Sequence, residues 1–185
     1  MAKHKVFISY HHANDEFYKK QFDEKFDSCF INKSVTAGEY SEDLSSDYIK
    51  RLIREDKISD CSVVAVLIGS ETYKRKHVDW EIYAGLCKKA GGYSGLIGII
   101  LPSYYDSDEN KHLKGLDKYN PNTIPPRLQD NINTGYATIY KWEDTQFKNI
   151  FGVYPIENWI EDAFNRKNNE CANINNGREQ FKHNR

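Results

Sequence analysis

The chain has 185 residues, enough for one well-formed hydrophobic core and short of two ordinary domains. Its 26 basic and 27 acidic residues nearly cancel, so the net charge of −1 gives no bulk attraction to nucleic acid or to an anionic membrane. The four cysteines form no CxxC pair and no zinc-like spacing, so no metal site is expected. The sequence shows neither a signal peptide nor an apolar run near the ~20 residues of a membrane span, which predicts a cytoplasmic protein.

Apolar segments alternate with helical patterns through the first hundred residues. Strands are predicted at KVFISY (5–10), FINKSV (30–35), SVVAVLIG (62–69) and GLIGIILP (95–102). Helices are predicted from Glu16, with Phe17, Phe22 and Phe26 as its apolar stripe, from a cap at Ser46 or Asp47, and over 72–90. This alternation predicts an α/β domain whose parallel strands are joined by crossover helices.

The chain changes character after Pro102. Residues 103–135 are polar and rich in Pro, Asn and Asp, and a long segment without regular structure inside a domain is usually functional or a family-specific insertion. A fifth strand is predicted at 136–142 and a last helix at 155–165. Beyond this helix apolar residues nearly vanish, so residues 166–185 are predicted to be a disordered tail.

The helix predicted over 72–90 contains the pair Trp80–Glu81. The apolar residues spaced by four that make its core stripe are Val78, Ile82 and Leu86. Glu81 lies on the flank of that stripe, which leaves two interpretations open. It is either a surface carboxylate paired with Lys74 or Arg75, or a carboxylate held at the ligand-binding edge of the sheet.

Ligands of open parallel sheets bind beyond the carboxyl ends of the strands. The residues expected to share that edge with the Glu81 helix are Ser9, Tyr10, His11, His12, Asn14 and Asp15. Neither a GxGxxG nor a P-loop pattern is present, so no standard nucleotide fingerprint supports this site. Adjacent histidines are not spaced as metal ligands, so a loop role or a phosphate contact is the interpretation of His11–His12.

Three stretches together resemble the TIR domain family. They are FISYHHANDEFY, SDCSVVAVLIGSETYKRKHVDWEI and GLIGIILP, and the resemblance covers about residues 5–103. Common TIR domains carry a Trp-Cys pair before the glutamate, whereas here Trp80 directly precedes Glu81. This departure favours the bacterial TIR-like group that includes the TIR subunit of Thoeris antiphage systems.

The resemblance implies a flavodoxin-like, three-layer TIR fold with about five parallel strands flanked by helices. It implies a TIR-like domain over 1–165, with a core at 5–103 and a family-specific extension at 104–165, and residues 36–46 in the place of the loop that gates the site or mediates assembly. It also implies that Glu81 is the catalytic residue. The substrate-binding residues expected beside it are Phe7, Ser9, Tyr10, His11, Asp15 and Trp80.

Catalytic TIR domains break the nicotinamide–ribose bond of NAD⁺, so the resemblance implies NAD⁺ as substrate with no cofactor. A cyclic or linear ADP-ribose derivative would then activate a separate antiphage effector, and the further partners suggested are a phage-derived trigger and a second copy of the chain. The alternative is a non-catalytic TIR scaffold that acts by protein association. A nucleoside-processing transferase on a similar sheet is a third hypothesis, distinguished by its use of free nucleosides.

Overall fold

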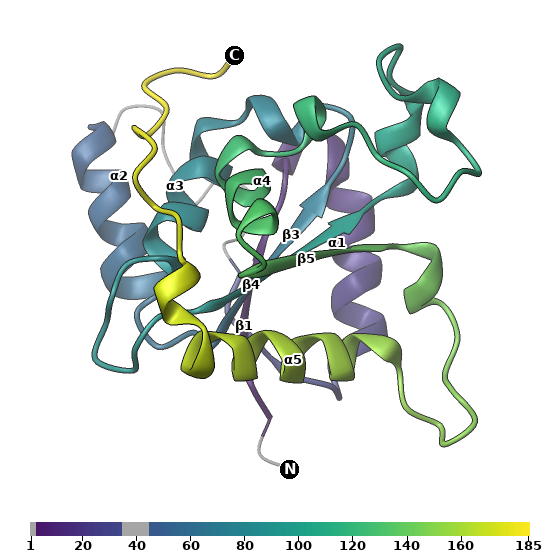
Figure 1. Ribbon diagram of the computed structural model, residues 1–185, viewed down its shortest axis with the longest axis horizontal. Helices are drawn as coiled ribbons and strands as arrows, with labels where there is room; N and C mark the ends of the chain where they lie inside the picture. The colour runs from purple at the N-terminus through teal and green to yellow at the C-terminus, as the bar shows by residue number, and fades with distance from the viewer. Residues whose placement is uncertain (1–2, 35–44) are drawn as a thin grey trace.

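Five parallel strands form one sheet in the computed structural model, which describes residues 3–34 and 45–185. The strands, in chain order, are β1 (Lys5–Ser9), β2 (Ile31–Asn32), β3 (Val63–Ile68), β4 (Gly95–Ile100) and β5 (Ala137–Lys141). Their order across the sheet is β2-β1-β3-β4-β5 (Figure 1). This is the strand order of the flavodoxin-like folds, so the predicted fold class is confirmed.

Helices cover both faces of the sheet (Figure 1). On one face lie α1 (His12–Phe26) and α5 (Pro155–Asn169), and on the other lie α2 (Ser46–Leu52), α3 (Lys76–Gly85) and α4 (Pro126–Asn133). Successive side chains of a strand point to opposite faces, so β1 sends Val6 and Ile8 into the first core and Phe7 into the second. Every residue of β3 and β4 is buried, which explains their continuous apolar sequences.

The first helix differs from its prediction in both its start and its buried face. It begins at His12 rather than Glu16, and Phe17 is 64% exposed. Its buried residues are Asp15, Lys19, Phe22 and Phe26. Two of these four positions are polar, and each has a hydrogen-bonding partner. Apolar periodicity therefore does not indicate this face and points to a stripe that includes Phe17 instead.

The segment 103–135 is largely folded, contrary to the expectation of a stretch without regular structure. It contains α4 and three short 3₁₀ turns, at Pro102–Asp106, Lys111–Leu113 and Pro121–Thr123. Tyr104 is fully buried there, and its hydroxyl lies 2.8 Å from Thr123 Oγ1 and accepts from the backbone of Asn120 at 2.9 Å. Polar bonds of this kind order the segment although its composition is that of a loop.

The prediction that residues 166–185 form a disordered tail is wrong. α5 continues to Asn169, and residues 174–185 then run along α3 and α4, as the yellow segment of Figure 1 shows. Phe181 is only 5% exposed, and its carbonyl accepts a hydrogen bond from the Trp80 indole at 2.8 Å. Backbone and amide hydrogen bonds hold this segment, so its low hydrophobicity did not predict disorder correctly.

The predicted 36–46 loop and the expected lack of a membrane-spanning helix are considered for the described residues. Residues 35–44, which include most of the 36–46 loop, lie outside the described residues, and Ser45 after them caps α2 by accepting from the backbone N–H of Tyr48. In the part of the chain that is described, every helix is too short or too polar to cross a lipid bilayer.

Candidate active site

The candidate site lies where the sheet reverses its winding direction, between β1 and β3. These two strands are hydrogen-bonded neighbours, with Ser9 opposite Val66. The chain leaves β1 into α1 on one face, and it leaves β3 towards α3 on the other face. The diverging connections mark the edge at which open α/β sheets bind their ligands.

Glu81 points into this edge from α3. Its side chain is only 2% exposed, and Ser9 Oγ at the end of β1 donates a hydrogen bond to Glu81 Oε2 at 2.6 Å. The absence of a side chain at Gly85 lets α3 approach the sheet, because a Cβ there would lie 2.7 Å from Val64 Cγ2. The structure therefore brings Ser9 and Glu81 together across 72 residues of sequence.

The surroundings of Glu81 favour its protonated form. Burial raises the pKa of Glu81 from 4.5 to about 8, and the hydrogen bond from Ser9 offsets only part of that rise. Lys74 and Arg75, the two possible cationic partners of a surface carboxylate here, bind Glu71 instead, at 3.3 and 2.8 Å. The interpretation of Glu81 as a surface carboxylate is therefore wrong.

Asp15 joins the ends of three strands beneath the site. Its buried carboxylate accepts a hydrogen bond from Ser103 Oγ, after β4, at 2.9 Å and another from Thr72 Oγ1, after β3, at 3.3 Å. Thr72 Oγ1 in turn accepts from the backbone N–H of Gly69 at 2.8 Å. Burial raises the pKa of Asp15 and the two hydroxyl donors counteract the rise, so Asp15 braces α1 against the sheet.

Gly69→Ala should disturb this brace. A Cβ at Gly69 would collide with the Asp15 carboxylate, so the carboxylate must move away from its hydroxyl donors. We expect the free energy of unfolding to fall by about 1–3 kcal/mol, as for other overpacked sites. Gly91→Ala is the matched control, because a Cβ there meets no atom within 4 Å. Equal urea-denaturation midpoints for the two variants would contradict this role of Asp15.

Tyr10 and His11 follow Ser9 at the same edge. The Tyr10 hydroxyl donates to Glu16 Oε2 at 2.6 Å, and burial together with the nearby Glu16 and Glu81 raises the pKa of Tyr10. Burial and then Arg75 lower the pKa of His11 to about 4, so its ring is neutral at neutral pH. His11 Nδ1 is buried without a hydrogen-bond partner among the described residues, which leaves a polar atom free at this edge.

Residues 7–106 match the family described as the TIR-like domain of the Thoeris protein ThsB. The matched range is more than half of the 185 residues and holds the end of β1, all of β3 and α3, and the Ser9–Glu81 pair. The chain belongs to this TIR-like family. A search of curated proteins found no match.

Membership of the family supports a role in Thoeris defence. The match ends at residue 106, before α4 and before the segment 174–185 that lies along α3. This TIR-like domain therefore carries contacts to its Glu81 helix from outside the matched range.

Phe7 and Trp80 of this TIR-like domain lie in the core behind the site. Phe7 is fully buried, and Trp80 is 1% exposed with its indole N–H bonded to the carbonyl of Phe181. The ammonium groups of Lys50 and Lys76 lie 4.9 and 5.3 Å from the centroid of the Trp80 ring. In this structure the two aromatic residues support α3, and neither forms an open wall beside the Glu81 carboxylate.

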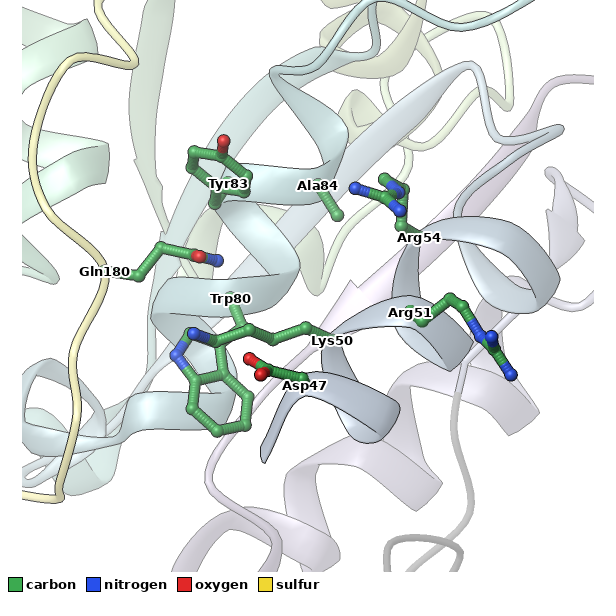
Figure 2. A pocket seen from close by; sticks show the side chains of 8 residues that line it. All are labelled: Asp47, Lys50, Arg51, Arg54, Trp80, Tyr83, Ala84 and Gln180. Atoms are coloured by element: carbon green, nitrogen blue, oxygen red, sulfur yellow. The ribbon is translucent and has the colours of Figure 1, made fainter. Parts of the chain in front are cut away.

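A surface hollow lies beside Trp80 between α2 and α3 (Figure 2). Its lining residues are Asp47, Lys50, Arg51, Arg54, Trp80, Tyr83, Ala84 and Gln180. Glu81 is not among them, and a second hollow reaches Tyr10 and Glu16 but also leaves Glu81 out. Since Glu81 is only 2% exposed in this structure, neighbouring groups must move aside to admit a ligand to its carboxyl.

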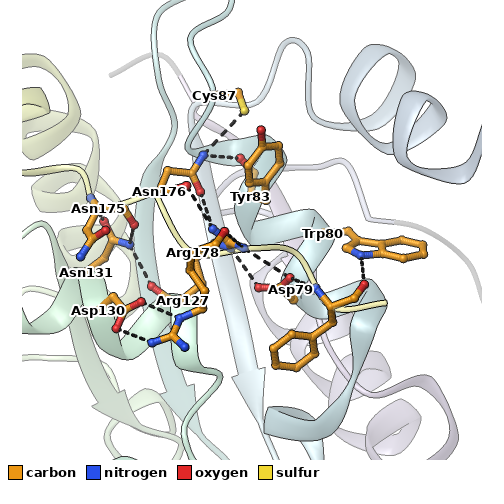
Figure 3. A network of polar contacts seen from close by, with 11 residues as sticks. Asp79, Trp80, Tyr83, Cys87, Arg127, Asp130, Asn131, Asn175, Asn176 and Arg178 are labelled. Atoms are coloured by element: carbon orange, nitrogen blue, oxygen red, sulfur yellow. Dashed lines mark hydrogen bonds and ion pairs between the residues drawn. The ribbon is translucent and has the colours of Figure 1, made fainter. Parts of the chain in front are cut away.

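No motif in the sequence indicates the polar network behind α3 (Figure 3). Arg127 on α4 is fully buried, and its Nε donates to Asp79 Oδ1 at 2.9 Å. Arg127 lies in a stretch predicted as a loop, where an arginine is normally exposed. The one indication in the sequence is that Asp79 has apolar neighbours, which favours burial of Asp79. Among the described residues, no three His, Cys, Asp or Glu side chains are grouped as a metal ion would require.

Proposed function

We propose that this TIR-like domain cleaves the bond between nicotinamide and ribose in NAD⁺, with Glu81 as the catalytic residue and with no cofactor. The observation that carries the proposal is the buried Glu81 carboxyl, bonded to Ser9 at the ligand-binding edge of the sheet. Membership of the TIR-like family supports the same assignment. A scaffold that acts only by association has no need of a buried acid at this place.

The reaction requires only one acidic side chain. Nicotinamide is a cationic pyridinium in NAD⁺ and leaves as a neutral molecule with the bonding electron pair, so no general acid has to protonate it. The ribose then carries the positive charge of an oxocarbenium-like transition state, which a fixed carboxylate stabilises. Attack by water, with loss of its proton, yields ADP-ribose, whereas attack by an atom of the ADP-ribose itself yields a cyclic product.

The raised pKa of Glu81 fits this role because the substrate is cationic. Without ligand, burial keeps much of the Glu81 carboxyl protonated at neutral pH. A pyridinium or an oxocarbenium ion placed beside Glu81 favours the ionised form, since opposite charges attract strongly where water is excluded. Because Glu81 is 2% exposed, binding must also open the site, and Tyr10, His11 and Asp15 are the residues we assign to the entering substrate.

The product is proposed to be a signal. In a Thoeris-type system, a cyclic ADP-ribose derivative would diffuse to a separate effector and activate it after phage infection. A phage-derived trigger would start NAD⁺ cleavage, and association of two copies of the chain would complete the assembly.

The test is to incubate NAD⁺ with the wild-type protein and to separate nicotinamide and the ADP-ribose products by chromatography, with and without extract of infected cells. We expect nicotinamide together with one ADP-ribose derivative in at least one condition. Release of no nicotinamide in either condition would reject the enzymatic proposal.

A non-catalytic scaffold is the second candidate, because one observation favours association. Phe147, Ile150 and Phe151 lie on the connection between β5 and α5 with 79%, 94% and 82% of their surfaces exposed. Large apolar side chains exposed together often mark a contact with another protein. Assembly of this kind is compatible with catalysis, so the product assay decides between an enzyme and a scaffold.

A further inference from the structure

Residues 174–185, here called the strap, run along α3 in the opposite direction to the helix (Figure 3). Near the end of α3, Asn176 Nδ2 donates to the carbonyl of Tyr83 at 3.2 Å. In the middle, the backbone N–H of Phe181 donates to Asp79 Oδ2 at 2.9 Å. At the start, Asn184 Oδ1 accepts from the backbone N–H of Lys76 at 2.9 Å and so caps the helix. The strap therefore contacts α3 along its whole length.

Arg127 connects the strap to α3 and α4. Its guanidinium donates to both oxygens of Asp79, at 2.9 and 3.4 Å, to the side-chain oxygen of Asn176 at 3.0 Å and to the carbonyl of Arg178 at 2.9 Å. Asp79 is 2% exposed and Arg127 is fully buried, so solvent cannot replace the ion pair between them. A shift of α3 away from Arg127 would leave these buried charges without partners.

The network and Glu81 act on opposite sides of the same helix. Each helical residue is rotated by about 100° from the one before it, so Asp79 and Glu81 point about 160° apart, on nearly opposite sides of the helix. Asp79 faces Arg127 and the strap, while Glu81 faces Ser9 on β1. The network therefore lies behind α3, on the side away from Glu81 and β1.

We propose that the strap and Arg127 are positioning elements that hold α3 against β1, so that Glu81 keeps its buried place beside Ser9. This inference deepens the proposed function, because it concerns the same carboxylate. Neither Arg127 nor the strap touches that carboxylate, so both act through α3. Release of the strap would let α3 move outwards and would admit water to Glu81.

Phe181→Ala tests the proposal, because it removes a side chain that is 5% exposed and anchors the strap. The first readout is the pH titration of the Glu81 carboxyl by ¹³C NMR, with the signal assigned by its absence in Glu81→Gln. We expect the pKa of Glu81 to fall by about one unit or more towards its ordinary value, since burial is the main cause that raises it. The second readout is NAD⁺ cleavage, in which we expect kcat to fall about tenfold and KM to change less.

Lys182→Ala is the matched control, because Lys182 lies in the strap with its side chain 76% exposed. It should leave both readouts as in the wild type. Asn184→Ala is the second test variant, for use if Phe181→Ala does not fold. It removes only an exposed cap of α3, so we expect this variant to stay folded. The Trp80 indole N–H signal reports release of the strap, because its acceptor is the Phe181 carbonyl.

The two proposals fail in different ways. A lowered pKa of Glu81 in the strap variants supports the positioning role even if no protein cleaves NAD⁺, in which case only the enzymatic proposal is rejected. If the strap is released and the pKa of Glu81 and the kcat both stay as in the wild type, the positioning role is overturned.

Discussion

Glu81→Gln should make the protein more stable than the wild type at pH 9 but not at pH 5. The pKa of Glu81 is about 8 in the folded protein against 4.5 ordinarily, so the folded state holds a proton that the unfolded chain has released between these values. Stability associated with this proton is therefore complete below pH 4.5 and is lost as pH rises to about 8. At 1.36 kcal/mol per pKa unit the loss is at most about 5 kcal/mol, and glutamine, which does not ionise, avoids it.

The measurement is urea denaturation of both proteins at pH 5 and at pH 9. The difference in unfolding free energy between variant and wild type is the relevant quantity, because the other titrating groups cancel in it. Glu55→Gln is the matched control, because it makes the same substitution at a side chain that is 56% exposed. A Glu81→Gln difference that does not change between pH 5 and pH 9 would mean that Glu81 is not a buried acid.

Arg127→Met should cause the second large effect, a loss of about 3–5 kcal/mol in the free energy of unfolding. The change leaves the carboxylate of Asp79 buried without its cation and removes donors from the carbonyls of Asn176 and Arg178. Methionine keeps much of the apolar volume of the arginine stem, so most of the loss comes from the missing charge and hydrogen bonds.

Arg178→Met is the matched control for this change. Arg178 pairs with Asp130 through two contacts, at 2.7 and 2.9 Å, but its side chain is 38% exposed. Exposed pairs of this kind contribute about 1 kcal/mol or less. Urea denaturation of the two variants should separate them clearly, and similar losses would show that the Arg127–Asp79 pair does not lock α3.

The sheet could be predicted from the sequence because its central strands are buried on both faces. VVAVLI in β3 and GLIGII in β4 are continuous apolar runs, and that pattern directly indicates parallel strands covered by helices. The strand order could then be inferred from the family resemblance. The edge of the sheet at which Ser9, Asp15 and Glu81 lie also followed from the topology.

Features held by polar contacts could not be predicted in the same way. Helical periodicity placed Glu81 on the flank of the core stripe, and its burial depends on Ser9, which is 72 residues away in sequence. The strap has too few apolar residues to suggest packing, and its order depends on bonds to Arg127 and Asn131. Such pairs are set by the three-dimensional arrangement of the chain, and a single sequence contains no periodic signal for them.

In the proposed function, Glu81 breaks the nicotinamide–ribose bond of NAD⁺. The most direct test is the initial rate of nicotinamide release at pH 8, with extract of infected cells, by the wild type, Glu81→Gln and Glu55→Gln. We predict that Glu55→Gln equals the wild type and that Glu81→Gln is slower by about 10²–10³-fold, because it lacks the charge that stabilises the transition state. Equal rates for Glu81→Gln and the wild type would contradict a catalytic role of Glu81.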